Sequence, residues 1–589
     1  MDDTNKRVLI AFALSFVILI TWKYAFPPPP EPVPPKPVAP AVQAQPSPAS
    51  RSERDPGVAP AASKGAPAKP APPAPAVVLP VQQGEKAEEI VVESDLYRVT
   101  FSTQGGVVKS WVLKKFADEH GKPLDLVNGP ACETLGFPMS LSLADEEMSK
   151  KLNSAFFVAT PSGPSLTAPA KLDLAYSDGK IQVKKHFEFG PGYEVRSEVS
   201  AFDGQQNSPI QVTWPGGFGD HSLPPERAAF ADHAAFQATG TEKVITESLT
   251  PSFLGGLFSR GTDPTNAKVD VSGPLTFAGL EDRFFAGIFL PDSADQAFHL
   301  KRLPWTPPDW KGKDTERPRP LAAWLGTAAP KPLAFRLFVG PRDTEILRAV
   351  NPPLDRLVDY GWFSFVAKPL FLAMHYIHDH WTHNFGWAII LLTVVINLAM
   401  FPLKLKSIRS AQEMQKIGPI VKGIQDKYKD YKFNDPRKQK MNKEIMDLYS
   451  QHGINPLGGC LPMVLQLPFL YGFYKVLDLS IELRHAPWFL WIKDLSAPDH
   501  IYILPVLMIV TMFILQKMTP VASADPAQQR MMMIMPLVFG IMFFRFASGL
   551  VLYWLTSNVV GIGQQVFINR MMPLPQKVPA PPKGQKAEK

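Results

Sequence analysis

The stretch WAIILLTVVINLAMFPLKLKS, residues 387–407, decides how the C-terminal part of this chain is organised. It is apolar up to its basic end, apart from Thr393 and Asn397, and it approaches the ~20 residues that span ~30 Å of hydrocarbon. An amide inside such a segment needs a partner or water, because unpaired polar groups are costly in lipid. The stretch therefore predicts a transmembrane helix that carries a polar patch.

Five further apolar stretches give the chain the organisation of a multi-pass membrane protein. Each has about the length needed to cross a bilayer. Together they predict an α-helical bundle of six transmembrane helices, made of an N-terminal anchor and a five-helix core over residues 385–570. The six apolar runs lie at residues 8–22, 385–403, 461–479, 501–516, 531–546 and 549–568.

The N-terminal stretch, residues 1–26, has Lys6 and Arg7 ahead of its apolar run. KYAFPPPP follows instead of a small-residue cleavage site, so an uncleaved signal anchor is favoured over a cleaved signal peptide. Residues 27–85 consist largely of Pro, Ala and Ser. A segment of that composition buries no core, and we expect a disordered, extended linker.

Residues 86–345 have the composition of a soluble domain. Apolar and polar residues alternate with a period of two in short runs such as KIQVKKHFEF, and Gly and Pro separate these runs. The pattern predicts one large antiparallel β-sandwich. His186, His221 and His233 lack the spacing of metal ligands, so we expect ordinary surface or hydrogen-bonded histidines and no metal or cofactor.

The distribution of cations predicts the orientation in the membrane. Residues 404–456 and 571–589 are rich in Lys and Arg, whereas residues 481–500 carry few, so both termini and the first of these segments are expected in the cytoplasm. The β-domain then lies in the periplasm of a Gram-negative bacterium, and residues 360–381 suit an amphipathic helix along the outer interface. Cys132 and Cys460 fall on opposite sides, so no disulfide is expected.

The cytoplasmic segment 404–456 predicts a two-helix hairpin. Ile417 and Val421 recur at helical spacing, and Asp435 followed by Pro436 is a typical helix start. The basic surface has two interpretations, either a solvated face that obeys the positive-inside rule or a docking surface for ribosome, nascent chain or anionic lipid. The cations of interest are Lys416, Lys422, Lys427, Arg437 and Lys438.

Polar residues inside the predicted spans gather in the halves that face the cytoplasm. Isolated amides between helices add only modest stability, and such contacts have no reason to prefer one leaflet. A shared wet cavity, open to the cytoplasm and closed outside, explains the bias, although interhelical hydrogen bonding remains an alternative for Asn397 alone. The residues are Thr393, Asn397, Gln466, Thr511, Gln516, Ser557, Asn558, Gln564 and Gln565.

Two long motifs carry a family resemblance. NPLGGCLPMVLQLPFLYGFYKVL at 455–477 and DPAQQRMMMIMPLVFGIMFFRFASGLVLYWLTSNVVGIGQQ at 525–565 resemble the YidC/Oxa/Alb family of membrane protein insertases, in its Gram-negative form. The resemblance implies insertion and folding of inner-membrane proteins through a hydrophilic groove, alone or with the Sec translocon. It also implies a periplasmic β-supersandwich similar to galactose mutarotases, and partners that are nascent chains, ribosomes and lipids, with no DNA.

The resemblance also implies a substrate groove. Many members carry an arginine where this chain has Asn397, so attraction of acidic substrate tails by charge is in question, and Arg545 lies toward the opposite leaflet. Trp554 stands where a family tyrosine often contacts substrate. The candidate groove residues, taken from this resemblance together with the depth of the polar residues, are Thr393, Asn397, Gln466, Thr511, Tyr553, Trp554, Ser557 and Asn558.

Two other classes of function compete with insertion. A transporter or channel with a carbohydrate-binding-like periplasmic domain needs a polar path to the outer face or an inverted repeat, and neither is evident. A membrane-tethered sugar enzyme needs an acid/base pair in the β-domain, and none is legible. The chain also has no GxxxxGK[ST] phosphate loop, so we expect neither a nucleotide motor nor an enzyme.

Overall fold

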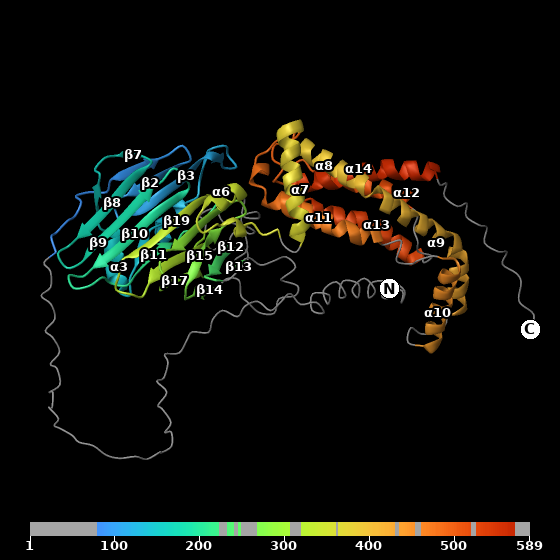
Figure 1. Cartoon of the computed structure of the whole chain (residues 1–589), viewed down its shortest axis with the longest axis horizontal. Helices are drawn as coiled ribbons and strands as arrows, with labels where there is room; N and C mark the ends of the chain where they lie inside the picture. The colour runs from blue at the N-terminus through green and yellow to red at the C-terminus, as the bar shows by residue number, and fades with distance from the viewer. Residues whose placement is uncertain are drawn as a thin grey trace, which may run out of the picture. The chain divides into compact units, whose positions relative to one another are not determined.

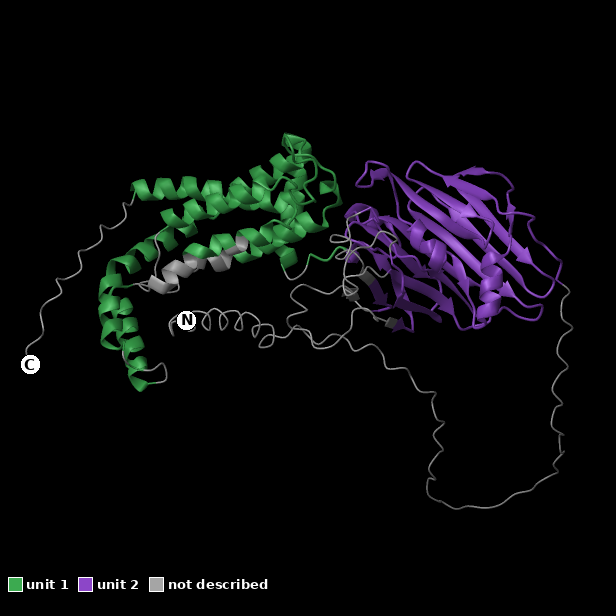
Figure 2. Cartoon of the chain, turned by 180° about the vertical axis from the view of Figure 1, so that it is seen from behind, with its two compact units in different colours: residues 1–28, 358–589 green, residues 29–357 purple. Residues whose placement is uncertain are grey.

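The computed structural model describes residues 79–222, 233–240, 245–248, 268–306, 320–360, 363–429, 431, 435–453, 461–519 and 526–571. They divide into two compact units, one ending at Leu357 and one beginning at Val358 (Figure 2). The predicted anchor at 1–26, nearly all of the linker at 27–85 and nearly all of the tail at 571–589 lie outside the described residues, as does Cys460.

The first unit is built on a nine-stranded sheet (Figure 1). Its strand order is β13-β12-β15-β16-β19-β10-β9-β8-β6. The strands are β6 Val158–Thr160, β8 Ala170–Ser177, β9 Gln182–Phe189, β10 Glu194–Phe202, β12 His233–Ala238, β13 Ile245–Ser248, β15 Leu275–Glu281, β16 Phe285–Pro291 and β19 Leu333–Pro341.

Two five-stranded sheets complete the unit, with the orders β4-β3-β2-β1-β7 and β14-β17-β18-β11-β5. The first comprises β1 Glu89–Glu93, β2 Tyr97–Ser102, β3 Val107–Ala117, β4 Pro123–Asp125 and β7 Ser165–Thr167. The second comprises β5 Ser140–Ser142, β11 Ile210–Trp214, β14 Lys268–Val271, β17 Gln296–Arg302 and β18 Leu321–Thr327. Short helices join them: α2 Gly129–Leu135, α3 Glu146–Ser154, α6 Thr344–Ala349 and the 3-10 helix η3 Asp355–Leu357.

The strand register shows that both small sheets pack on one face of the large sheet. Phe189 pairs with Val195, Val195 with Leu337, and Leu337 with Phe289. Directly opposed residues share a face, so Phe189 and Phe289 point the same way. The ring of Phe189 contacts that of Phe101 in β2, and Phe289 contacts Phe298 in β17. The unit is therefore a sandwich, as the period-two pattern predicts.

The opposite face of the large sheet is polar, which explains the alternation along β10 and its neighbours. Arg196 lies opposite Glu188 and Arg336, and the guanidinium of Arg336 donates to Glu194 at 3.1 Å. Pairing among the described strands is antiparallel except between β1 and β7, which are parallel. The expectation of a purely antiparallel domain was wrong at that pair, which joins the edge strand β7 to β1.

His186 and the cysteine of this unit have ordinary environments. Nδ1 of His186 lies 2.6 Å from Oδ1 of Asp173, and His221 is exposed. Cys132 is a free, buried thiol, and burial raises its pKa to about 12. In the described part of the chain, no cluster of three or more metal-ligating side chains occurs.

Lys185 is a fully buried cation at the centre of the sandwich. Its ammonium donates to the carbonyl oxygens of Gly105 at 2.8 Å, Gly106 at 2.9 Å and Met139 at 2.8 Å. Gly105 has φ +74°, and a Cβ there would lie 2.4 Å from the carbonyl oxygen of Asn153, so only glycine fits this turn. Three acceptors match the three donors of an ammonium and tie two sheets together through one side chain.

The second unit is helical. The apolar stretches predicted at 461–479, 501–516, 531–546 and 549–568 all form helices with nearby bounds. The elements are α7 Ser364–Ile377, the π-helix η5 His378–Thr382, α8 Phe385–Ala399, α9 Phe401–Lys427, α10 Pro436–Gln451, α11 Leu461–Leu479, the 3-10 helix η7 Ile481–Leu483, α12 Ile503–Met518, α13 Pro526–Phe543 and α14 Ser548–Met571.

The stretch 385–403 is divided between two helices. The α8 helix ends at Ala399, and α9 begins at Phe401 with Pro402 in its first turn. Proline has no N–H to donate and suits the start of a helix, which explains the break at Met400. Among the described helices, none by itself combines the length and apolar character of a membrane span; Ser364–Thr382 and Phe385–Ala399 satisfy that criterion only as a pair, bent by 117°.

In the segment where the hairpin is predicted, the C-terminal half of α9 packs on α10. Met414, Ile417 and Val421 form a small buried cluster, against which Ile445 and Leu448 pack. The side chain of Asp435 accepts from the backbone N–H of Arg437 at 2.9 Å and caps α10, as its sequence predicts. The hairpin therefore has its own apolar core.

Replacing Lys185 with Met should destabilise the β-sandwich. The change leaves three buried carbonyl oxygens without donors, at about 1–3 kcal/mol each, partly offset by removal of a buried charge, so we expect a net loss of about 2–4 kcal/mol. Urea unfolding of a soluble fragment, residues 79–357, measures it. Lys184→Met is the matched control because Lys184 is exposed on the same strand. Equal stability of the two variants would contradict the proposal that the hydrogen bonds of Lys185 stabilise the sandwich.

The stability difference between wild type and Lys185→Met should depend on pH. Burial lowers the pKa of Lys185 to about 7. Above that pH the unfolded chain binds more protons than the folded chain, so the free energy of unfolding of wild type should rise relative to the variant from about pH 7 to about pH 9. Urea titrations at several pH values test the sign, and a flat or falling difference would refute it.

Candidate functional site: a polar cluster around helix α14

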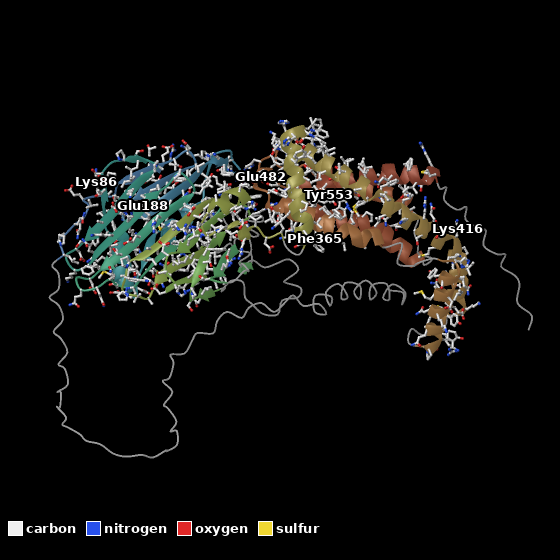
Figure 3. The ribbon with its side chains drawn as sticks, viewed as in Figure 1. Lys86, Glu188, Phe365, Lys416, Glu482 and Tyr553 are labelled. Atoms are coloured by element: carbon white, nitrogen blue, oxygen red, sulfur yellow. The ribbon has the colours of Figure 1, made fainter. Side chains whose placement is uncertain are left out.

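The helix α14 collects the candidate groove residues because several helices pack against it. It contacts α8 along one side and α12 along another, with α11 also touching it. Its buried positions include Tyr553, Asn558, Gln564 and Gln565, so polar side chains occupy the interior of an otherwise apolar bundle. Figure 3 labels Tyr553 within this bundle.

Asn397 joins α8 to α14. Its amide nitrogen donates to the carbonyl oxygen of Thr393 and to the hydroxyl of Ser557, each at 2.9 Å. The side-chain amide of Gln564 in turn donates to the backbone carbonyl of Asn397 at 2.9 Å. The Thr393 hydroxyl is fully buried and donates to Ile389 O. Thr393 and Asn397 of α8 thus form one connected network with Ser557 and Gln564 of α14.

Lys404 extends this network into the first turn of α9. Its ammonium donates to Oε1 of Gln564 at 3.1 Å. Since the same Gln564 amide also binds the carbonyl of Asn397, one side chain links the cation to the network.

Gln466 approaches α14 from α11. Its amide nitrogen lies 3.4 Å from the hydroxyl of Tyr553, and the Tyr553 ring stacks on Phe473 at a centroid distance of 4.4 Å. The aromatic stack holds the phenol in place, and the hydroxyl faces the polar side chain.

The remaining predicted groove residues lie on other sides of α14. Asn558 donates to the hydroxyl of Thr511 at 3.3 Å and is buried against α12. Trp554 packs edge-on against Phe543 of α13, at a centroid distance of 4.9 Å. The structure therefore brings Thr393, Asn397 and Ser557 into one network, which continues from Ser557 through the hydroxyl of Tyr553 to Gln466. It places Thr511, Asn558 and Trp554 elsewhere.

Solvent exposure divides the polar residues into a buried set and a half-buried set. Thr393, Tyr553 and Gln564 are buried. Asn397, Ser557, Gln466 and Lys404 are half-buried, so their polar atoms are available at an edge of the bundle. Hydroxyl, amide and ammonium groups at such an edge can exchange hydrogen bonds with a polar chain segment, but they hold no general base beside a nucleophile. The arrangement suits binding, without bond-making chemistry.

Sequence reasoning missed two members of the network. Gln564 was recognised only as an inward polar residue, and Lys404 only as one cation of the cytoplasmic segment. A signal exists for Gln564, since it follows Ser557 by seven residues, or two turns of the same helix. Lys404 follows Asn397 by seven residues, but the break at Met400 lies between them. Arg545 is exposed between the end of α13 and the start of α14. Ser557 lies nine residues after Ser548, the first residue of α14, so Arg545 is separated from the network by more than two helical turns.

The basic side chains of the hairpin differ in their surroundings. Lys416, Lys422 and Lys427 are exposed on α9 (Figure 3 labels Lys416). Arg437 instead forms an ion pair with Asp435 at 3.0 Å and lies over the ring of Tyr431 at 3.9 Å. Lys438 is half-buried. The unpaired charge of the docking set therefore lies mainly on α9.

Comparisons with known proteins agree along nearly the whole chain. The model of the family described as "60Kd inner membrane protein" matches residues 376–576, and that described as "YidC periplasmic domain" matches residues 89–373. The membrane protein insertase YidC of Syntrophus aciditrophicus is 33% identical over 96% of this chain and 99% of its own length. That of Geotalea uraniireducens is 35% identical over 97% of this chain and 100% of its own length.

A crystal structure of an active YidC insertase with its first transmembrane domain resolved is 20% identical, with a TM-score of 0.33, over 82% of this chain and 94% of that one. The periplasmic-domain model covers the described part of the β-unit from residue 89 and extends into α7, and the other family model covers the described helical unit from residue 376. The two sequence relatives cover 96% and 97% of the chain. The chain is an inner-membrane protein with a periplasmic domain, and its substrates are membrane proteins. It therefore belongs to the YidC family of membrane protein insertases, which are not enzymes.

Proposed function

We propose that this insertase works through a hydrophilic groove, open to the cytoplasm, whose polar edge is formed by Asn397, Ser557 and Gln466. The observation that carries the proposal is the hydrogen-bonded link from Asn397 to Ser557 and Gln564, with half-buried polar atoms at its edge. Such an edge offers hydrogen bonds to the hydrophilic end of a passenger while that end crosses the apolar layer.

In the proposed mechanism, the protein speeds the transfer of a passenger segment from water into the lipid bilayer. Taking polar backbone and charge through hydrocarbon is the main cost of insertion, and a wet half-channel shortens that path. The apolar segment of the passenger then moves into lipid, and its burial, at roughly 25 cal/mol per Å², supplies the driving force. An exposed apolar side chain supports this, because Leu398 follows Asn397 on α8 and presents apolar surface beside the polar edge.

The proposed topology places α8 and α11 to α14 across the inner membrane, with α7 along the outer interface. Both termini and the hairpin at 404–456 lie in the cytoplasm, and the domain predicted at 86–345 lies in the periplasm. The asymmetry of Lys and Arg between the two sets of loops supports this orientation. An apolar N-terminal anchor at residues 1–26 completes the proposed set of six spans.

The proposed partners follow from the exposed surfaces. Nascent inner-membrane proteins enter the groove, and the hairpin cations Lys416, Lys422 and Lys427 meet the ribosome, together with the basic tail. RNA phosphates attract clustered cations strongly, and the attraction weakens with salt. We further propose that the protein works alone or beside the Sec translocon, in contact with membrane lipids.

Asn397→Leu should slow insertion of substrates with short polar tails. The change removes the donors to Ser557 and Thr393 and makes the edge apolar, so we expect insertion to fall about three- to tenfold. Protease protection of a single-span reporter in proteoliposomes measures the rate. Val395→Leu is the matched control, since Val395 is an exposed apolar residue of the same helix. Wild-type rates for Asn397→Leu, with unchanged thermal stability, would exclude the groove role.

Replacing Lys416, Lys422 and Lys427 together with Gln should weaken ribosome binding about tenfold, because each exposed cation adds a salt-sensitive attraction to RNA phosphates. Co-sedimentation with ribosomes at two salt concentrations measures the effect. Arg437→Gln is the control, since Asp435 already pairs with Arg437. If the triple variant sediments like wild type, the hairpin surface is a solvated face and no docking site.

A further inference from the structure

Lys404 is a cation without a carboxylate partner at the proposed groove. Its ammonium has three N–H donors, and among the described residues only Oε1 of Gln564, at 3.1 Å, accepts from it. The ion pairs of the described part of the chain do not include Lys404. A half-buried ammonium that contacts one neutral amide keeps most of its capacity to bind an anion.

Gly561 provides the space that Lys404 occupies. A Cβ at Gly561 would lie 3.2 Å from the Lys404 Nζ and 3.1 Å from Leu515, so a larger residue would crowd the ammonium, which would have to shift by a few tenths of an ångström. At Gly563, two residues further along the same helix, a Cβ would meet nothing within 4 Å. The lysine therefore lies against the surface of α14, on the side that also presents Gln564.

The Lys404 side chain is hydrogen-bonded to the polar network of α8 and α14 and does not extend with the other cations of the cytoplasmic segment. Gln564 donates to the backbone carbonyl of Asn397 with one amide atom and accepts from Lys404 with the other. The cation is thus one side chain away from the groove edge. Its neighbour Lys406 on α9 is exposed, and Arg545 lies before the first residue of α14, at the end of that helix opposite Gln564.

We propose that Lys404 is the residue that selects for passengers with acidic tails, by pairing its ammonium with an Asp or Glu carboxylate in the polar segment. The proposal rests on the proposed groove function and adds a charge preference to it. Near apolar surroundings the attraction between opposite charges is several times stronger than in bulk water. A groove lined only by Asn, Ser and Gln would have no such preference for charge.

The observations favour a passenger carboxylate over a lipid phosphate as the anion. Lysines that serve lipid headgroups extend away from the bundle into the interface. The Lys404 ammonium instead turns inward, over Gly561 and onto Gln564, where α9 and α14 meet.

The test uses two single-span reporters that differ only in two tail residues, Asp or Asn. Insertion into phosphatidylcholine proteoliposomes containing the full chain gives the ratio of acidic-tail to neutral-tail yield. We expect Lys404→Gln, which keeps an amide donor, to lower that ratio about two- to fivefold, and Lys404→Arg to retain it. Lys406→Gln removes the same charge from an exposed site and should leave the ratio at the wild-type value.

A second pair of variants tests the position of the ammonium without changing charge. Gly561→Ala should lower the ratio because the new methyl group displaces Nζ, whereas Gly563→Ala should not. Neutral-tail insertion by the wild-type protein tests the proposed groove. If the wild-type protein fails to insert the neutral-tail reporter, the proposed function is contradicted. The charge preference is tested separately, by the ratio of acidic-tail to neutral-tail yield.

Three outcomes would overturn the proposal. The first is an unchanged ratio in Lys404→Gln alongside normal neutral-tail insertion. The second is an equal fall with both Lys404→Gln and Lys406→Gln, which would show a general effect of surface charge. The third is an effect of Lys404→Gln that is equal for both tails and arises only when phosphatidylglycerol is added, which would assign Lys404 to a lipid headgroup.

Discussion

The helical unit depends on one constraint: a polar side chain inside an apolar bundle has to find a hydrogen-bond partner. The helix α14 meets this constraint on several sides, with Ser557 and Gln564 toward α8 and α9, and Asn558 toward α12. Each contact joins two helices and leaves its half-buried members at an edge of the bundle. The same hydrogen bonds that hold the helices together therefore also place polar groups at this edge, where we propose the groove.

Much of the helical region could be predicted from sequence, because long apolar runs and a helix start at Asp435 and Pro436 are local signals. The pairing of Asn397 with Ser557 is not local, since 160 residues separate them, and polar depth alone could not tell a shared network from scattered contacts. The depth argument grouped Thr511 and Asn558 with Asn397, although Asn558 of α14 faces Thr511 of α12 and not α8. Lys404 was counted as a loop cation because the positive-inside rule treats every lysine beyond an apolar run alike.

The sandwich was predictable for the opposite reason, since strand alternation marks the buried face without any knowledge of partners. The alternation even places Lys185 between Val183 and Phe187 on the buried side of β9. What it could not supply is the acceptor set, because the carbonyl groups of Gly105, Gly106 and Met139 come from loops far away in the chain. Sheet order and the parallel pair β1–β7 likewise depend on tertiary packing.

The helix α9 runs without interruption from Phe401, through Lys404, to the exposed Lys416. At 1.5 Å per residue, the path from Lys404 to Lys416 is about 18 Å of rigid rod. A rotation or tilt at the Lys416 end of α9 is transmitted along the helix to Lys404, because a helix bends far less readily than a loop. A displacement at the hairpin end of α9 would therefore be transmitted to Lys404 and to its hydrogen bond with Gln564.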